Sequence, residues 1–476
     1  MFLGIDLGTG SVKVLLTDRD GQPVAEASRV YPVVSPARGH AETDPALWWS
    51  ATVEAVREAC AGRADGIDAI GLSGQAHGIV TLDGAGAVLR PAILWPDQRA
   101  TAQMAEMLAL PEALRLPLAN PVVGGMAAVS LMWIRDEQPE IFAATRHALS
   151  PKDWLRYRMT GALATEPSDA SMTLLYELTT DRWSDDLLRA LRIPSSILPP
   201  LRRSEEVAGH LGAEAAAAMG LRAGIPVGTG LADSAACLLG MGQVEPGKTI
   251  LQIGSGIQLM ALVDGVAPRI QPFYNTFRAA EGTAYLMAAS LNGGTAFEWV
   301  RGVLKADWDE MYQAAFAVED AGEVIFLPYA SGERAPILDA EASAAFAFMK
   351  LGCTRAQVIR SAFDGVALAI RDIWDALGAD GVTAPSMLLT GGGTTDPRWR
   401  QLLADTIGVP LVPAVAPGTA ALGAAYLAGL AVGRWHGARD LPVSGSVDAT
   451  VMPRPDPGLE RRLARFRATY RALKAV

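Results

Sequence analysis

Apolar positions at the start of the chain follow the two-residue period of strands. Three such stretches, at 1–6, 11–18 and 22–28, are separated by short glycine-containing turns, so we expect a three-stranded meander. The same order returns at 248–264, where a strand, a Gly-Ser-Gly turn and a second strand follow one another. This internal repeat predicts two domains that each begin on a hairpin with a glycine turn, although two such hairpins also arise by chance.

Helical spacing of apolar residues follows the meander. A helix is predicted at 44–63, where Thr43 or Asp44 is the N-cap and Pro45 stands in the first turn. Further predicted elements are a strand at 67–74, a hairpin at 78–95, helices at 354–377 and 397–408, and a strand at 386–393. The mixture of strands and helices predicts an α/β fold.

Length and composition narrow the class of protein. The 476 residues exceed what one hydrophobic core usually serves, which favours two domains, at 1–244 and 245–476. A net charge of −10 argues against nucleic acid or an anionic membrane as partner. The amphipathic, arginine-rich stretch at 459–473 is interpreted as a helix that caps a domain rather than one that binds a membrane.

The setting of the protein is predicted from its cysteines and its first residues. The chain has 3 cysteines, far apart and without a CxxC pair, which is typical of a reducing compartment. It begins in a strand without a basic and apolar leader, and no apolar run is long enough to span a bilayer. We therefore expect a cytoplasmic protein with no membrane partner. The sequence leaves the oligomeric state open, a homodimer included.

Three glycine turns follow predicted strands, at Gly8-Thr9-Gly10, Gly254-Ser255-Gly256 and Gly391-Gly392-Gly393. Such turns direct several backbone N–H groups to one point and suit phosphate oxygens. The third turn also precedes the helix predicted from 397, whose N-terminus attracts anions. A single glycine turn is a common way for a strand to end. Three such turns together indicate a nucleotide held across a cleft.

Asp6 stands close before the first glycine turn, separated from it by Leu7, where a carboxylate would repel a phosphate. A Mg²⁺ ion resolves the conflict, because it prefers oxygen ligands, keeps several waters and needs only one or two carboxylates. Thr9, Ser11 and Lys13 follow closely and are further candidates for phosphate contact. The competing interpretation is that Asp6 only bonds the N–H groups of its own turn.

Longer stretches of the chain resemble the carbohydrate kinases of the FGGY family, and among them most closely the xylulokinases. The resemblance covers nearly the whole chain and rests on GIDLGTGSVKVLLTD, IGLSGQAHGIVTLDGAGAVLRPAILWPDQR, SPKDWLRYRMTG, IPVGTGLADSAACLLGMG, FLPYASGERAP and LLTGGGTTDPRWRQLLAD. It implies a two-domain actin/hexokinase-like (ribonuclease H-like) fold, in which each domain is a mixed sheet flanked by helices and a cleft between the domains holds sugar and ATP. The N-terminal domain would supply the sugar site and the catalytic base, and the C-terminal domain the nucleotide site.

The resemblance also implies roles for individual residues. Asp233 becomes the general base that takes the proton of the attacking sugar hydroxyl, although an Asp at this place also suits a helix N-cap. Asp233 is a second candidate for contact with Mg²⁺, beside Asp6 acting through water. The candidate sugar contacts are Gln75, Ala76, His77, Asp97, Asp233 and Ser234. The candidate nucleotide contacts are Gly8, Thr9, Gly10, Ser11, Lys13, Gly254, Ser255, Gly256, Gly294, Gly392, Gly393 and Asp396.

For two further pairs of residues a structural role competes with contact to the substrate. Asp97 is equally well explained by an ion pair with Arg99. Glu333 and Arg334 in the SGERAP stretch are interpreted as a structural pair that shapes the cleft.

Three departures from the xylulokinase pattern concern the sugar. Ser234 stands where an asparagine is usual, the segment at 124–135 differs, and the turn IGSGIQ is closer to the glycerol-kinase form. The resemblance thus implies an ATP-dependent kinase that phosphorylates a terminal hydroxyl of a small ketose, D-xylulose first. The alternatives are a kinase for ribulose, a deoxyketose or glycerol, or an ATP-binding sugar sensor without catalysis.

Overall fold

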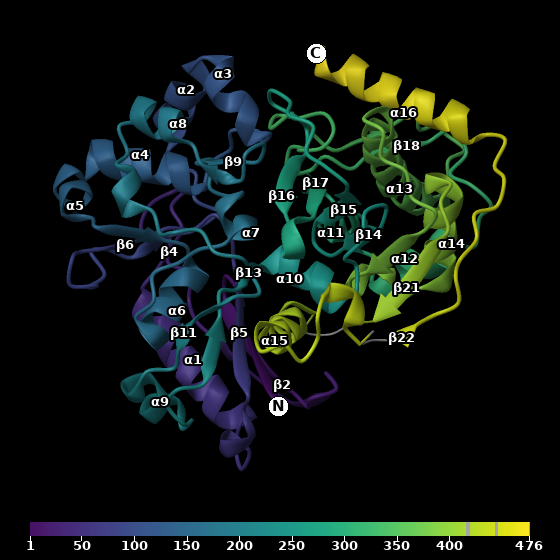
Figure 1. Cartoon of the computed structure of the whole chain (residues 1–476). Coiled ribbons are helices and arrows are strands. Elements are labelled where there is room, and N and C mark those ends of the chain that lie inside the picture. Colours follow the sequence, from purple (N-terminus) through teal and green to yellow (C-terminus); the bar gives the residue numbers. More distant parts are fainter. Residues whose placement is uncertain (416–418, 443–445, 476) are drawn as a thin grey trace.

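The fold consists of two lobes, each built on a seven-stranded mixed sheet (Figure 1). The structure is a computed structural model and describes residues 1–415, 419–442 and 446–475. In the first sheet the strands lie in the order β11-β12-β5-β1-β2-β3, and β13 also pairs with β5. Their bounds are β1 Phe2–Leu7, β2 Ser11–Thr17, β3 Pro23–Val30, β5 Ala69–Gly74, β11 Val207–His210, β12 Pro226–Gly228 and β13 Leu231–Ala232.

The second sheet repeats the topology of the first. Its order is β16-β17-β15-β14-β20-β21-β22, and its bounds are β14 Thr249–Ile253, β15 Ile257–Val263, β16 Asn275–Arg278, β17 Ala284–Ser290, β20 Met387–Thr390, β21 Leu411–Val415 and β22 Ser446–Val447. In each sheet an antiparallel meander continues into parallel strands: β3-β2-β1 is joined by β5 and β12, and β17-β15-β14 by β20 and β21. The predicted internal repeat is therefore a repeat of the whole sheet.

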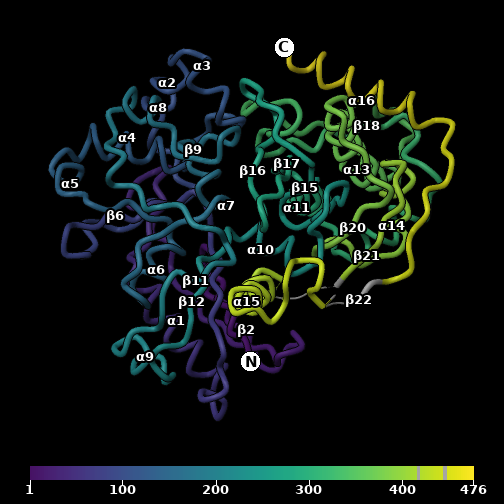
Figure 2. Tube along the Cα trace, viewed as in Figure 1, coloured from purple at the N-terminus to yellow at the C-terminus, as the bar shows by residue number. Residues whose placement is uncertain are grey.

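Helices cover the sheets of both lobes (Figure 2). In the first lobe they are α1 Pro45–Ala59, α2 Thr101–Ala109, α3 Glu112–Arg115, α4 Ala127–Glu137, α5 Pro139–Ala144, α6 Pro151–Thr160, α7 Pro167–Ala170, α8 Asp185–Ala190, α9 Ala213–Met219 and α10 Asp233–Gly240. Later in the chain they are α11 Gly294–Leu304, α12 Trp308–Ala315, α13 Arg355–Ala379, α14 Pro397–Ile407, α15 Thr419–Ala431 and α16 Leu459–Lys474. Small two-stranded ribbons pair β4 Glu42–Thr43 with β7 Ala92–Ile93, β6 Val80–Leu82 with β8 His147–Leu149, β9 Tyr176–Glu177 with β10 Arg182–Trp183, and β18 Ile325–Leu327 with β19 Ala345–Ala347.

Helix α15 belongs to the second half of the chain but packs against the first sheet, beside β5 and β2 (Figure 1). Glycines allow this close contact, because a Cβ atom on Gly4 of β1 would lie 1.9 Å from the carbonyl oxygen of Ala421, and one on Gly71 of β5 would lie 1.9 Å from that of Ala424. Helix α10 packs on the other side of α15 and shares a hydrophobic cluster with Ile250 of the second sheet. The two helices thus join the lobes.

The predicted elements are present, with two differences. The hairpin predicted at 78–95 is held only by isolated bridges, because β6 pairs with β8 and β7 with β4. The strand predicted at 386–393 ends at Thr390, because Gly391 turns the chain with a φ of 105° and a 3₁₀ turn follows at Gly392–Thr394. The two-domain α/β fold itself is confirmed. The predicted boundary at 244/245 lies between α10 and β14.

Candidate active site

Two carboxylates meet where the lobes join. Asp6 lies near the end of β1, and Asp233 is the first residue of α10, directly after β13. Because β13 and β1 both run parallel to β5, their C-terminal ends reach the same edge of the first sheet. The two residues line one cavity of about 380 Å³, together with His77, Trp95 and Ser234. We call it the acidic cavity.

Burial makes both carboxylates reluctant to ionise. It raises the pKa of Asp6, which the hydrogen bond from the Ser73 hydroxyl at 3.1 Å and the charge of Lys13 only partly offset. Burial, followed by the negative charge of Asp6, raises the pKa of Asp233 to about 7. The backbone N–H of Ser234 donates to an Asp233 carboxylate oxygen at 2.6 Å and favours the ionised form. Asp233 is thus a group that exchanges a proton near neutral pH.

A buried cluster of charges holds the segment that presents Asp233. The guanidinium of Arg156 donates to the carbonyl of Thr229 at 2.6 Å, and the backbone N–H of Ala232 donates to the hydroxyl of Ser168 at 2.8 Å. The Ser168 hydroxyl in turn donates to the Glu166 carboxylate at 2.9 Å. The members of the cluster are fully or almost fully buried: Lys152, Asp153, Arg156, Glu166, Ser168 and Asp169. Their hydrogen bonds fix the backbone immediately before Asp233.

His77 lines the acidic cavity as a neutral hydrogen-bond acceptor. Its Nδ1 lies 2.7 Å from the carbonyl oxygen of Met172, and since a carbonyl only accepts, Nδ1 carries the proton. Burial lowers the pKa of His77 to about 4, so the ring is neutral at pH 7 and Nε2 accepts. The backbone of His77 has a φ of 67°, and the flanking Ala76 also lines the cavity.

Gln75 has a different place from the one predicted. Its side chain is buried and donates from Nε2 to the carbonyl of Gly8 at 3.2 Å, and it does not line the acidic cavity. Gln75 therefore connects the GQAHG stretch to the first glycine turn. The Trp95 indole N–H, which donates to the Thr9 hydroxyl at 2.8 Å, and the Tyr31 hydroxyl, which donates to Gly8, hold the same turn.

Asp97 and Arg99 form the ion pair that the sequence offered as an alternative. The Asp97 carboxylate accepts from the Arg99 guanidinium at 2.7 Å and from the backbone N–H of Ala41 at 2.6 Å. Arg99 also bonds Glu42 at 2.6 Å and lies over the ring of Trp133. The carboxylate of Asp97 is buried and already paired, and it is not part of the cavity wall.

Two further cavities continue from the acidic cavity across the second lobe. The middle cavity, about 310 Å³, shares Trp95, Gln252 and Arg334 with the acidic cavity and is also lined by the second glycine turn. The aromatic cavity, about 870 Å³, shares Gly254 and Ser255 with the middle cavity. Together the three form one path from Asp233 to the C-terminal ends of β14 and β20, the central strands of the second sheet.

Most of the predicted nucleotide contacts border this path. Gly254 and Ser255 line the middle and the aromatic cavity, Gly256 lines the middle one, and Gly294, Gly392 and Gly393 line the aromatic one. Thr9 lines the acidic cavity. The predicted residues that line none of the three cavities are Gly8, Gly10, Ser11, Lys13 and Asp396. Asp396 instead caps α14 and pairs with Arg398 at 2.7 Å.

Aromatic side chains that the sequence analysis did not single out form the wall of the aromatic cavity. Trp308 and Tyr312 stand four residues apart on α12, and Phe297 faces Trp308 from α11 with a centroid distance of 6.4 Å. Their spacing on a helix is also that of ordinary core residues. The sequence alone therefore did not distinguish them as residues of a binding site. An aromatic wall of this kind suits an apolar ring.

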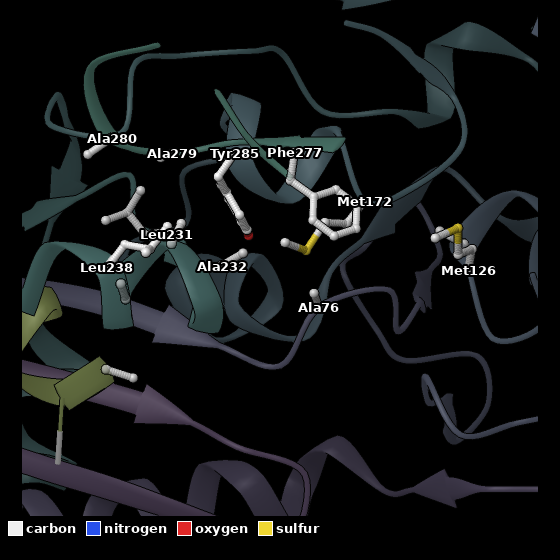
Figure 3. Packing of buried hydrophobic residues seen from close by; sticks show 14 of the residues in the cluster. Ala76, Met126, Met172, Leu231, Ala232, Leu238, Phe277, Ala279, Ala280 and Tyr285 are labelled. Carbon is white, nitrogen blue, oxygen red and sulfur yellow. The ribbon is translucent and has the colours of Figure 1, made fainter. Parts of the chain in front are cut away.

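Ser234 has a partner from the second lobe. Its hydroxyl lies 2.7 Å from that of Tyr285 on β17. Figure 3 shows the Tyr285 hydroxyl pointing toward the first lobe near Ala232, with Phe277 and Met172 beside it. The hydroxyl of Ser234 is therefore engaged in a contact between the lobes.

The duplicated fold and the cleft with its two carboxylates define the class of protein. Residues 1–240 match the N-terminal domain of the FGGY family of carbohydrate kinases and residues 257–432 its C-terminal domain, so the chain belongs to this family. The predicted family is confirmed. Sugar kinases of this family use ATP.

Among individual relatives, xylulose kinases are similar over most of the chain. The xylulose kinase of Escherichia coli is 33% identical over 415 residues, which are 86% of each protein. That of Klebsiella pneumoniae is 33% identical over 474 residues, 98% of this chain and 96% of the relative. The crystal structure of xylulose kinase from Rhodospirillum rubrum, 28% identical, superposes with a TM-score of 0.91 over 100% of this chain and 99% of the other.

A helix that crosses a membrane has to be long and apolar. Within the residues that the structure describes, none of the helices combines the length and the apolar character that crossing a bilayer requires.

Proposed function

We propose that this kinase transfers the γ-phosphoryl group of ATP to a terminal primary hydroxyl of a small ketose, with D-xylulose as the first candidate. The observation that carries the proposal is Asp233, a proton acceptor fixed at the end of a path of cavities leading to the three glycine turns. In the reaction the hydroxyl oxygen bonds to the γ-phosphorus, the bond to the β–γ bridging oxygen breaks and ADP leaves. Asp233 takes the hydroxyl proton.

Asp6 and Asp233 also fit a Mg²⁺ ion. The described residues hold no group of three or more His, Cys, Asp or Glu side chains that would form an all-protein metal site. Two carboxylates whose pKa values are raised by burial nevertheless suit a cation that takes its other ligands from water and phosphate. When bound, Mg²⁺ would neutralise phosphate charge.

His77 restricts the sugar that fits. Because Nε2 of the neutral ring only accepts, it binds a hydroxyl and not a carbonyl oxygen. A ketose in the acidic cavity would therefore place a hydroxyl on His77 and its terminal hydroxyl on Asp233. The neutral acceptor supports a polyhydroxylated ligand and gives no advantage to a carbonyl at that position.

Ser234 is the main reason to test other sugars. It is shorter than the asparagine usual in xylulokinases, and its hydroxyl already bonds Tyr285. A sugar hydroxyl left without a partner costs about 1–3 kcal/mol. We therefore expect either a high KM for D-xylulose or a preference for a ketose that lacks or inverts this hydroxyl. Ribulose, a deoxyketose and glycerol remain the alternatives, whereas a sensor without catalysis has no use for the proton acceptor Asp233.

A panel of D-xylulose, D-ribulose, 1-deoxy-D-xylulose and glycerol with MgATP, assayed by ADP release, tests the proposal. Either D-xylulose or a ketose that lacks or inverts the unpartnered hydroxyl is expected to give the highest kcat/KM, and Ser234→Asn should raise kcat/KM for D-xylulose alone. Asp233→Ala, which cannot accept the proton, is the control for ADP release unrelated to sugar. A wild-type enzyme that prefers glycerol, or a Ser234→Asn variant that loses D-xylulose turnover, would contradict the assignment of the sugar.

A further inference from the structure

In the SGERAP stretch, hydrogen bonds hold the carboxylate of Glu333 in place, whereas the guanidinium of Arg334 is unpaired among the described residues. Glu333 is buried and accepts four hydrogen bonds, from the Ser290 hydroxyl at 2.6 Å, the backbone N–H of Leu291 at 3.1 Å, the Asn292 amide at 3.1 Å and the backbone N–H of Arg334 at 2.6 Å. It therefore anchors the stretch to the segment that follows β17. Of the two residues interpreted as a structural pair that shapes the cleft, Glu333 has this role through its own hydrogen bonds and not through an ion pair with Arg334.

The backbone of Arg334 is fixed on both sides. The carbonyl of Arg334 accepts from the N–H of Leu338 at 2.6 Å, and the N–H of the next residue, Ala335, donates to the carbonyl of Ala289 at 3.0 Å. Glu333 and Asp339 exchange two backbone hydrogen bonds at 2.7 and 2.8 Å. The base of the Arg334 side chain is thus held rigidly against β17.

The guanidinium of Arg334 has no partner. Among the described residues it makes no ion pair and no side-chain hydrogen bond, and the residue is exposed where it lines two cavities. The partial loss of water around the guanidinium lowers its pKa although Glu333 is near. Several other arginines of this lobe are paired, for example Arg355 with Glu310 at 2.7 Å and Arg398 with Asp396 at 2.7 Å. An unpaired cation on a rigid base is poised for a ligand.

Arg334 stands at the junction of the acidic and middle cavities and lines both. Of the described residues that line the three cavities, Arg334 is the one lysine or arginine, whereas Asp6, Asp233 and Glu298 are acids. A phosphoryl group that moves from the glycine turns to Asp233 must pass this junction. Two carboxylates repel it there, and a forked guanidinium offers paired donors to its oxygens.

We propose that Arg334 binds oxygens of the γ-phosphoryl group of ATP and holds that group during its transfer to the sugar. This inference rests on the proposed kinase reaction, in which the phosphorus–oxygen bond to ADP breaks as the bond to the sugar oxygen forms and Asp233 takes the proton. Arg334 is then a catalytic residue that contacts the reacting group, and Glu333 is the residue that positions it.

The ratio of ATP to ADP affinity tests the proposal directly, because only ATP has the γ-phosphoryl group. The binding of each nucleotide is measured by calorimetry for the wild type, Arg334→Gln and Arg334→Lys. Loss of a hydrogen bond to a charged group should weaken ATP binding by roughly ten- to a hundredfold in Arg334→Gln and leave ADP binding within about twofold. Arg334→Lys retains a point charge and should lie between the two.

Arg355→Gln is the matched control, because it removes an arginine of the same lobe that lines none of the three cavities and should leave the ratio unchanged. An ATP-to-ADP ratio that stays the same in Arg334→Gln would overturn the proposal, whatever happens to turnover. If the wild type phosphorylates no sugar of the panel while Arg334→Gln still lowers the ratio, the assigned sugar is wrong and the role of Arg334 stands.

Discussion

The buried carboxylate of Asp233 lowers the free energy of unfolding at neutral pH. Its pKa rises from 3.8 to about 7, mainly through burial and next through the charge of Asp6. Between these two values the unfolded chain has lost the proton and the folded protein still binds it, so the free energy of unfolding falls as pH rises from about 4 to 7. Above pH 7 the loss in the free energy of unfolding is complete, and below pH 4 there is no loss.

Asp233→Asn should therefore separate activity from stability. We expect kcat to fall by roughly 10²–10⁴, while the free energy of unfolding at pH 8 rises by on the order of 1 kcal/mol and the difference vanishes near pH 4. Urea unfolding at both pH values measures it. Asp65→Asn, which removes an exposed acid, should change neither quantity. An Asp233→Asn enzyme within tenfold of wild-type kcat would refute the general base.

The sequence was enough to predict the place of some site residues and not of others. Asp6, His77 and Asp233 lie at or just beyond strand ends with glycine nearby, where polar side chains reach a cleft, and all three line the acidic cavity. Gln75 has the same sequence context, but its amide turns back to Gly8, and no pattern distinguishes the two orientations. Whether Arg334 pairs with Glu333 depends on the Ser290 and Asn292 contacts, which lie about 40 positions away along the chain.

At the scale of elements, α15 depends on glycines that the sequence pattern treats only as turn or strand residues. Gly71→Ala would place a Cβ atom 1.9 Å from the carbonyl oxygen of Ala424, and neither backbone is free to move. We expect a loss of about 1–3 kcal/mol or more in the free energy of unfolding, measured by urea. Gly302→Ala in α11 is the control, because a Cβ atom there meets nothing within 4 Å, and alanine should be neutral or slightly stabilising. Equal stability of the two variants would contradict the close contact.

Periodicity predicted most elements because each buries one face. The helix at 44–63 and the strands of both meanders have a regular apolar side, and α1, β1, β2, β14 and β15 lie where it indicated. Helix α15 is buried on nearly all sides, so its sequence has no polar face from which a partner sheet could be predicted. Its position against β1 and β5 is a long-range contact that local patterns do not contain.

At the scale of the whole molecule, contacts on one side of the cleft limit how the lobes move. The Asn120 side chain exchanges hydrogen bonds of 2.8 Å with both backbone groups of Thr276, and the backbone N–H of Arg278 donates to the Ser171 hydroxyl at 3.1 Å. We therefore expect the cavities to narrow by rotation of the lobes about this side and about the α10–α15 pair. Sugar binding should drive that closure and exclude water before transfer.

Small-angle scattering should then give a smaller radius of gyration with saturating sugar than without it. The sugar of highest kcat/KM in the panel is the ligand to use. Asp233→Asn should close like the wild type, because it removes the proton acceptor and keeps a hydrogen-bonding side chain of the same size. A radius that does not change at saturating sugar would count against closure.

The contact of α15 with the first sheet also bears on how the protein is made. A ribosome completes β1, β2 and β5 long before the helix that covers them, Thr419–Ala431, which belongs to the second half of the chain. Until then the glycine-lined apolar face of the first sheet stays open to water and to other nascent chains. The first lobe therefore completes its packing only after this helix has been synthesised, and chains truncated before the helix present a surface prone to aggregation.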